Sequence, residues 1–144
     1  MTSRSRRITI VAALVASFGL LDSGYLTVKH LEGSYIRCGD ECSAVLGSRY
    51  AEGIAGVPLA GFGAAAYLTV LVATILAACG INFGRQVFTA MSIFMALFSV
   101  WLIYLQAFVI HSFCKYCLAS AGACLTLALL ALIDRFSPRA ASLK

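Results

Sequence analysis

The sequence predicts an all-α integral membrane protein, a single domain over residues 1–144 that is built as a bundle of four transmembrane helices. Hydrophobic residues make up 61% of the chain and charged residues 12%, about half the charged share of soluble domains. The apolar residues are gathered in four runs, each long enough to cross a bilayer as a helix of roughly 20 residues. This composition excludes a soluble core and indicates membrane lipid, not nucleic acid, as a partner.

The four runs predict helices at about 8–28, 57–79, 87–110 and 114–133. Asp22 alone interrupts the first run, the second and third contain no charge, and the fourth contains only Lys115 near its start. A basic start with small residues also suggests a cleaved signal peptide. We expect a retained helix instead, because the first run exceeds the usual apolar length of a signal and its removal would leave three spans.

The basic residues that flank the runs predict the orientation, since short cytoplasmic loops of membrane proteins are rich in Lys and Arg. Four helices place both termini on one side. That side carries Arg4, Arg6, Arg7, Arg85, Arg135, Arg139 and Lys144, whereas the other carries Lys29, Arg37, Arg49 and Lys115. We therefore expect cytoplasmic termini in the inner (cell) membrane and an extracytoplasmic loop at 29–56. Within this loop, segment 44–50 is expected to lie on the membrane surface as a short amphipathic helix.

Two cysteine pairs fall on the extracytoplasmic side, where an oxidising compartment lets disulfides persist. The loop carries Cys38-Gly39-Asp40-Glu41-Cys42, and the last run begins with Cys114-Lys115-Tyr116-Cys117. A C-x-x-C at a helix start is typical of a redox-active dithiol, because residues three apart lie nearly on one face, about 5 Å apart. Electrons can then pass between the pairs. Cys79 and Cys124 are interpreted as small apolar packing residues.

The two sulfurs of the C-x-x-C are expected to differ. With Ser112 as a plausible N-cap, Cys114 would lie in the first helical turn, exposed, and stabilised as a thiolate by the helix dipole and Lys115. Cys117 would lie one turn deeper and face the apolar interior. Such a pair could couple a soluble thiol carrier to a lipid-soluble acceptor, for which a quinone is the natural candidate. We expect Cys38 and Cys42 to lie on a hinged loop, whose motion lets Cys42 reach Cys114 for thiolate exchange.

Simpler interpretations stay open at this stage. The pairs could be structural disulfides in a non-catalytic membrane subunit, or the four thiolates could bind structural zinc, which an oxidising compartment disfavours. A carboxylate at the depth of Asp22 in the first run is energetically costly, so Asp22 is a functional candidate for a proton path to the quinone. An equally good interpretation is that Asp22 faces a water-filled pocket, or that it is protonated and hydrogen-bonded to a neighbouring residue.

The ordered motifs resemble the vitamin K epoxide reductase family, in its bacterial branch that oxidises thioredoxin-like proteins. They are Cys42-Ser43-Ala44-Val45-Leu46-Gly47-Ser48, Gly56-Val57-Pro58-Leu59, Gly63-x-x-x-Tyr67 and Cys114-Lys115-Tyr116-Cys117. The resemblance implies a separate thioredoxin-like (DsbA-like) extracytoplasmic partner that is oxidised by Cys38 and Cys42. It also implies exchange between Cys42 and Cys114, and reduction of a quinone, menaquinone or ubiquinone, by Cys117. Ser48 matches a serine that the family keeps near its active site.

The chain departs from the family at two expected quinone contacts. By the resemblance, Leu59 stands where the animal enzymes have an asparagine, and Ala121 where they have a tyrosine. We therefore expect an apolar quinone pocket next to Cys117, lined by Leu59, Phe62 and Ala121. Reduction of a quinone is expected there, with weak or no reduction of an epoxide, because a dry pocket offers no proton to an opening epoxide ring.

Overall fold

The computed structural model describes residues 3–33, 39–53 and 57–136, apart from the side chains of residues 3–5 and 41–42. Within these ranges the chain is helical, and the helices follow one another in a simple order. They are α1 (Ser3–Leu31), α2 (Asp40–Leu46), α3 (Leu59–Ala78), α4 (Asn82–Leu105), the π-helical turn η1 (Gln106–Ile110) and α5 (Lys115–Phe136).

Four of these elements are long and apolar enough to span a membrane, which confirms the expected all-α membrane bundle. The spans are Arg6–Leu31, Leu59–Ala78, Asn82–Ile110 and Lys115–Phe136. Their ends lie within a few residues of the runs expected from the sequence. The largest extensions are at the starts of α1 and α4, which begin before their apolar runs at Ser3 and Asn82, because a helix continues into the polar edge of the bilayer beyond its apolar residues.

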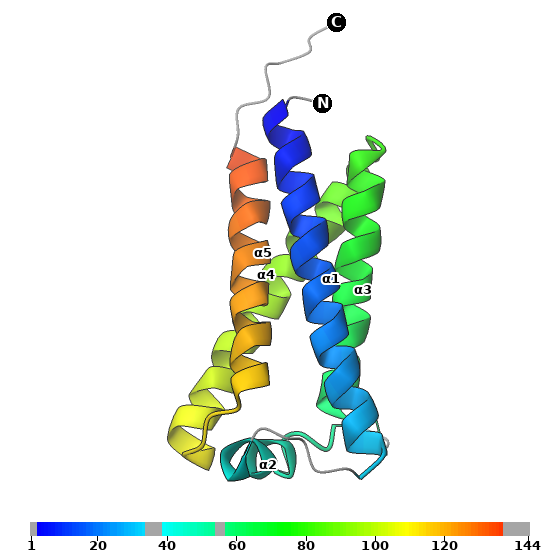
Figure 1. Cartoon of the computed structure of the whole chain (residues 1–144). Helices are drawn as coiled ribbons and strands as arrows, with labels where there is room; N and C mark the ends of the chain where they lie inside the picture. The colour runs from blue at the N-terminus through cyan, green and yellow to red at the C-terminus, as the bar shows by residue number, and fades with distance from the viewer. Residues whose placement is uncertain (1–2, 34–38, 54–56, 137–144) are drawn as a thin grey trace, which may run out of the picture.

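The helices form an up-and-down bundle with two distinct ends (Figure 1). Ser3 at the start of α1 and Phe136 at the end of α5 lie at one end, called here the termini end, and α2 lies across the other, called the α2 end. α1 packs against α3 and α5, and α4 packs against the same two helices. The surfaces that face away from these contacts carry many exposed Leu, Val, Ile and Phe side chains, as lipid-facing helices do.

A glycine lets α1 and α3 approach closely. A Cβ atom at Gly19 would overlap ring atoms of Tyr67, whose side chain is 1% exposed. Small residues are common where membrane helices meet, since packing rather than water exclusion holds such helices together. The rest of the core continues towards the termini end and includes Ala12, Ala16, Val70, Ala73, Phe88, Leu127 and Ala131. Tyr67 therefore sits at the boundary between the packed core and the α2 end.

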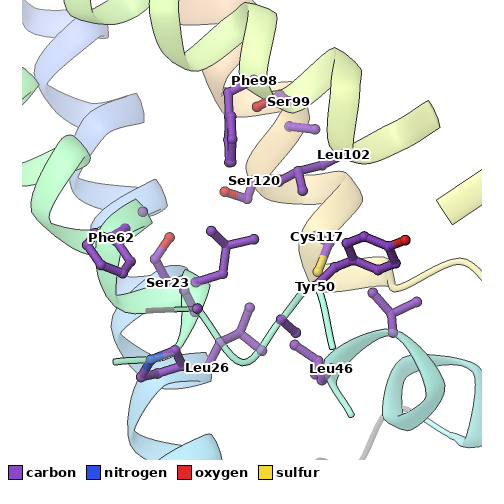
Figure 2. A pocket seen from close by; sticks show the side chains of 18 of the residues that line it. Ser23, Leu26, Leu46, Tyr50, Phe62, Phe98, Ser99, Leu102, Cys117 and Ser120 are labelled. Carbon is purple, nitrogen blue, oxygen red and sulfur yellow. The ribbon is translucent and has the colours of Figure 1, made fainter. Parts of the chain in front are cut away.

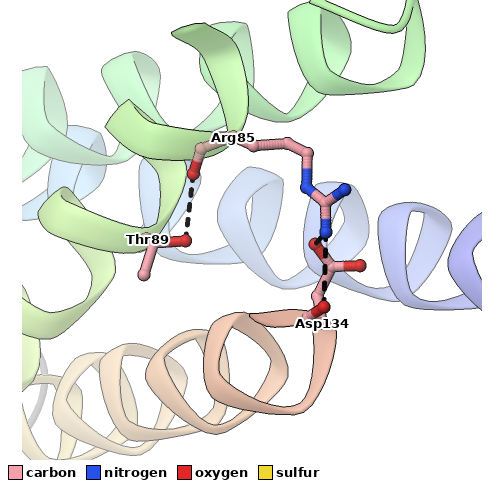
Figure 3. Close-up of polar contacts among 3 residues, drawn as sticks. All are labelled: Arg85, Thr89 and Asp134. Atoms are coloured by element: carbon pink, nitrogen blue, oxygen red, sulfur yellow. Dashed lines mark hydrogen bonds and ion pairs between the residues drawn. The ribbon is translucent and has the colours of Figure 1, made fainter. Parts of the chain in front are cut away.

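An ion pair links α4 to α5 at the termini end (Figure 3). Arg85 Nη2 lies 2.6 Å from Asp134 Oδ2 and 3.3 Å from the Asp134 carbonyl oxygen, while Thr89 Oγ1 donates to the carbonyl of Arg85. Both charged side chains remain partly exposed. This pair fixes the start of α4 against the end of α5, far from the cysteines of the α2 end.

The short surface helix was expected at 44–50, and this position is wrong: α2 spans Asp40–Leu46. Gly39, with a φ of 92°, permits the sharp turn before the helix, which then includes Cys42. After Leu46 the chain turns, as Ser48 Oγ donates to the Val45 carbonyl oxygen at 2.7 Å. The position of α2 is set by burial of Val45 against the bundle, and residues 47–50 follow as a turn.

Candidate active site at the α2 end

Cys114 is itself the N-cap of α5, where Ser112 was expected. Its carbonyl oxygen accepts the Leu118 N–H at 2.9 Å, and its Sγ accepts the Cys117 N–H at 3.4 Å. The second bond satisfies one of the amide groups that a helix start leaves without a partner. The sulfur of Cys114 therefore lies at the positive end of the helix dipole, where a thiolate is stabilised.

Cys114 was expected to be the exposed sulfur, and this expectation is wrong, because its side chain is 0% exposed. Val45 and Leu46 of α2 cover it from one side, and Ile110 and Tyr116 pack beside it. The sequence could not show this cover, since it depends on α2 lying across the bundle. Cys117, one turn further along α5, is partly exposed.

The surroundings of Cys114 favour its thiolate in the reduced pair. A hydrogen bond from the Cys117 thiol outweighs the effect of burial and, together with the backbone N–H groups of Cys117 and Tyr116, lowers the pKa of Cys114 from 9.0 to about 7. A thiol with a pKa near the ambient pH is well suited to thiol–disulfide exchange, both as attacking and as leaving group. The low pKa favours Cys114 as the reactive member of the pair, the role expected for it from the sequence, although α2 covers it.

Gln106 fixes the turn that leads into the C-x-x-C, a role that sequence reasoning missed. Its side chain is 4% exposed, and its Oε1 accepts the Cys114 N–H at 3.1 Å. Its carbonyl oxygen accepts the Ser112 N–H at 3.2 Å, and His111 takes up a left-handed conformation with a φ of 53°. Gln106 opens the π-helical turn η1, and π-turns inside helices are frequent at functional sites. An amide side chain in an otherwise apolar run was the available signal.

A cavity of about 390 Å³ lies beside Cys117, between α2 and the four spans. This volume is within the range of small-molecule sites. Cys117, Leu59, Phe62 and Ala121, the residues expected to surround a quinone, all line it. Figure 2 shows Cys117 and Phe62 on opposite sides of the cavity, with Leu46 at its α2 end. Phe94, Met95 and Phe98 of α4 also line it.

Hydroxyl groups also line the cavity, which corrects the expectation of a dry apolar pocket. Tyr67 Oη donates to the Ser120 carbonyl oxygen at 2.7 Å and lies 3.0 Å from both Ser120 Oγ and Cys124 Sγ. All three residues line the cavity, and Ser120 lies one turn beyond Cys117 (Figure 2). Cys124 thus takes part in a polar network. The reason given for expecting weak epoxide reduction, a pocket without a hydroxyl, no longer holds.

Asp22 lies on the face of α1 that looks towards these residues. Gly19, one turn before it, meets the Tyr67 ring, and Tyr25, one turn after it, lies 5.9 Å from Tyr116 between ring centroids. Asp22 Oδ2 is buried and has no hydrogen-bond partner among the residues that the structure describes. Its carboxylate interacts electrostatically with Tyr67, Cys114 and Cys117.

The remaining expected site residues are placed in part. Ser48 lines the cavity, but its hydroxyl is used in the turn after α2. Cys42 lies on α2, one turn before Val45, and its side chain is outside the described residues, as is the whole of Cys38. Within the part of the chain that the structure describes, no three His, Cys, Asp or Glu residues come together as metal ligands would.

Comparison with known proteins identifies the family to which these features belong. No curated protein shows a significant match to the chain. The model of the vitamin K epoxide reductase family, however, matches residues 10–132, which include α2, the cavity and the C-x-x-C. The chain therefore belongs to the vitamin K epoxide reductase family.

Proposed function

We propose that the protein generates disulfides by passing electrons from a separate extracytoplasmic thioredoxin-like protein to a membrane quinone, menaquinone or ubiquinone. Membership of the family makes it a membrane thiol–disulfide oxidoreductase, and the direction, the partner and the acceptor are our proposal. The observation that carries it is the position of the C-x-x-C. Cys114 lies directly under α2, and Cys117 lines the cavity.

The first transfer joins α2 to the start of α5. In this step the partner reduces the Cys38–Cys42 disulfide, and the Cys42 thiolate then attacks Cys114 in the Cys114–Cys117 disulfide, which releases Cys117. Cys38 next attacks Cys42, so that the loop disulfide reforms and Cys114 leaves as a thiolate. The low pKa of Cys114 makes it a good leaving group. Val45, one turn after Cys42, packs on Cys114, which supports a short path between them.

The second transfer takes place in the cavity. As Cys114 and Cys117 close to a disulfide they lose two electrons and two protons, and a quinone is an acceptor of both. Leu59, Phe62 and Ala121 would bury its ring, at roughly 25 cal/mol per Å² of apolar surface. The hydroxyls of Tyr67 and Ser120 are the polar groups that could bind a quinone oxygen, in place of the side chains absent at Leu59 and Ala121.

Quinone reduction by the purified protein tests this function directly. Reduced thioredoxin-like protein should drive reduction of menaquinone or ubiquinone, and comparing the two identifies the acceptor. Cys117→Ser should abolish turnover and trap a Cys42–Cys114 mixed disulfide, detected by peptide mapping, because Cys114 can still attack the loop disulfide but Cys117 is no longer there to displace Cys42 from it. Cys79→Ser is the matched control, since Cys79 is exposed at the termini end of α3.

Two outcomes would contradict parts of the proposal. A wild-type protein that reduces no quinone would favour a non-catalytic membrane subunit with structural disulfides. A trapped species with Cys38 joined to Cys114 would leave the function standing but exchange the roles of the two loop cysteines.

A further inference from the structure

We propose that Asp22 accepts the proton of Cys117 when the C-x-x-C pair delivers its electrons, and that Asp22 then returns this proton to the reduced acceptor. The inference rests on the proposed function and adds a residue that the cysteine chemistry by itself does not require. A carboxylate within a membrane span carries a high free-energy cost, so its presence indicates either a charge partner or a functional role.

The structure places Asp22 between the C-x-x-C, which would give up the proton, and Tyr67, which lines the cavity of the acceptor. Along α1, the turn before it contacts the Tyr67 ring through Gly19, and the turn after it contacts Tyr116 of the C-x-x-C through Tyr25. Residues three apart are neighbours on a helix face, so Asp22 lies between these two contacts. Its carboxylate interacts electrostatically with Cys117 on one side and with Tyr67, which lines the cavity, on the other.

The buried oxygen of Asp22 is available for a proton. Among the described residues, Asp22 Oδ2 and Ser92 Oγ are the buried side-chain oxygen or nitrogen atoms without a hydrogen-bond partner. Neither residue lines the cavity itself. Ser92 lies in α4, whereas Asp22 lies in α1 directly before Ser23, which does line the cavity. A buried carboxylate oxygen without a donor leaves a large free-energy cost that a transferred proton would remove.

Proton transfer to Asp22 also helps the next step. Cys117 must lose its proton to become a nucleophile, and a charge in an apolar cavity is costly, so a nearby base lowers the barrier. While ionised, Asp22 makes a small contribution that raises the pKa of Cys114. The Cys117 thiolate adds to a ring carbon of the quinone, and Asp22 now carries the proton. With Asp22 protonated its effect on Cys114 is absent, which favours the Cys114 thiolate as it attacks the Cys117 sulfur. The S–S bond forms, the bond between Cys117 and the quinone breaks, and the hydroquinone leaves with the electron pair, the proton of Asp22 and the proton that Cys114 had released. The overall balance stays two thiols and one quinone to one disulfide and one hydroquinone.

Asp22→Asn tests this role, because it keeps the shape of the side chain and removes the base. We expect the rate of quinone reduction at neutral pH to fall on the order of 100-fold, mainly in kcat. Asp22→Glu should recover part of the rate, since it restores a carboxylate. Glu52→Gln, which neutralises an exposed carboxylate at the α2 end, is the control and should leave the rate unchanged.

The pH profile separates a base from a structural residue. Protonation of the Cys114 thiolate, whose pKa is about 7, should lower the rate below neutral pH in both proteins. In the wild type the rate should fall further at lower pH as Asp22 takes up a proton, and Asp22→Asn should lack this second limb. The titratable groups that face Asp22 are Tyr67 from α3 and Cys114 and Cys117 from the start of α5, with Tyr25 and Tyr116 beside them. These groups are phenols and thiols, which lose their protons at a higher pH than a carboxyl group does, so their titration is distinguishable from that of Asp22.

Alkylation of Cys117 in reduced Cys114→Ser protein gives a second readout that needs no quinone. Removing a negative charge cannot lower the thiolate fraction of a nearby cysteine, so Asp22→Asn should alkylate at Cys117 as fast as its parent or faster. A quinone reduction rate within twofold of wild type would overturn the inference. So would slower alkylation in parallel with the lost turnover, which would show a displaced Cys117. An inactive wild type would instead overturn the proposed function, and this inference with it.

Discussion

Cys114 combines two roles that the sequence suggested for separate residues. It caps α5 through its Sγ, and its pKa is lowered below that of an ordinary thiol. The spacing of the C-x-x-C predicted a pair on one helix face, but not which residue begins the helix. That choice depends on Gln106 Oε1, which binds the Cys114 N–H and is eight residues away in sequence.

The pKa of Cys114 depends mainly on Cys117, and this dependence is testable by pH. The Cys117 hydrogen bond is the largest influence that lowers the pKa to about 7, so Cys117→Ala should move it up towards the ordinary 9.0. The thiolate is the reactive form and predominates above the pKa. Alkylation of Cys114 in reduced protein, followed by mass spectrometry from pH 5 to 10, should therefore show its midpoint near pH 7 in the wild type and higher in the variant. An unchanged midpoint would assign the shift to the backbone amides instead.

Two glycines of α1 provide a matched test of the contact with Tyr67. A Cβ at Gly19 would overlap the Tyr67 ring, whereas a Cβ at Gly24 has no atom within 4 Å. Gly19→Ala should therefore destabilise the protein by about 1–3 kcal/mol and weaken quinone reduction, because Tyr67 must move away from the cavity. Gly24→Ala should be neutral or slightly stabilising. Thermal unfolding in detergent compares the two variants. Equal melting temperatures would show that the Tyr67 side chain can move aside without loss of stability.

At the scale of elements, hydropathy predicted the four spans well and the segments at the α2 end less well. A span is specified by its own composition, since about 20 apolar residues suffice. α2 contains 7 residues and is held by Val45 and Leu46 against the C-x-x-C, so its bounds depend on contacts distant in sequence. The π-turn at 106–110 has no signature in hydropathy, because the run stays apolar through it.

Gln106 links η1 to the C-x-x-C and can be tested by removing its acceptor. Gln106→Leu leaves the buried Cys114 N–H without its partner, which should cost about 1–3 kcal/mol of stability. Exchange between Cys42 and Cys114 should slow as well, since the start of α5 loses its anchor. Gln86→Leu is the control, because Gln86 is exposed at the termini end of α4, the helix that η1 continues. If both variants unfold alike and exchange at the wild-type rate, the turn does not depend on this bond.

At the scale of the whole molecule, the bundle separates two kinds of chemistry. The α2 end holds the C-x-x-C, the cavity and the helix that carries Cys42. The termini end holds the Arg85–Asp134 ion pair and a packed apolar core. The resemblance to the family placed Leu59, Phe62 and Ala121 beside Cys117, and all three line the cavity. The Tyr67–Ser120–Cys124 network could not be predicted, because it depends on how α3 and α5 are rotated towards each other.

The proposed function requires the α2 end of the bundle to face the extracytoplasmic side of the membrane. Cys79 at the termini end and Cys42 at the α2 end allow this orientation to be tested. Arg6, Arg7, Arg85 and Arg135 lie at the termini end, which the excess of basic residues predicts to be cytoplasmic. In a variant that keeps Cys79 as its single cysteine, a membrane-impermeant maleimide should label inverted vesicles and not intact cells, since Cys79 is exposed at the termini end of α3. A variant that keeps only Cys42 should label in intact cells. The opposite pattern would place the C-x-x-C in the reducing cytosol, where a disulfide relay to a secreted partner could not operate.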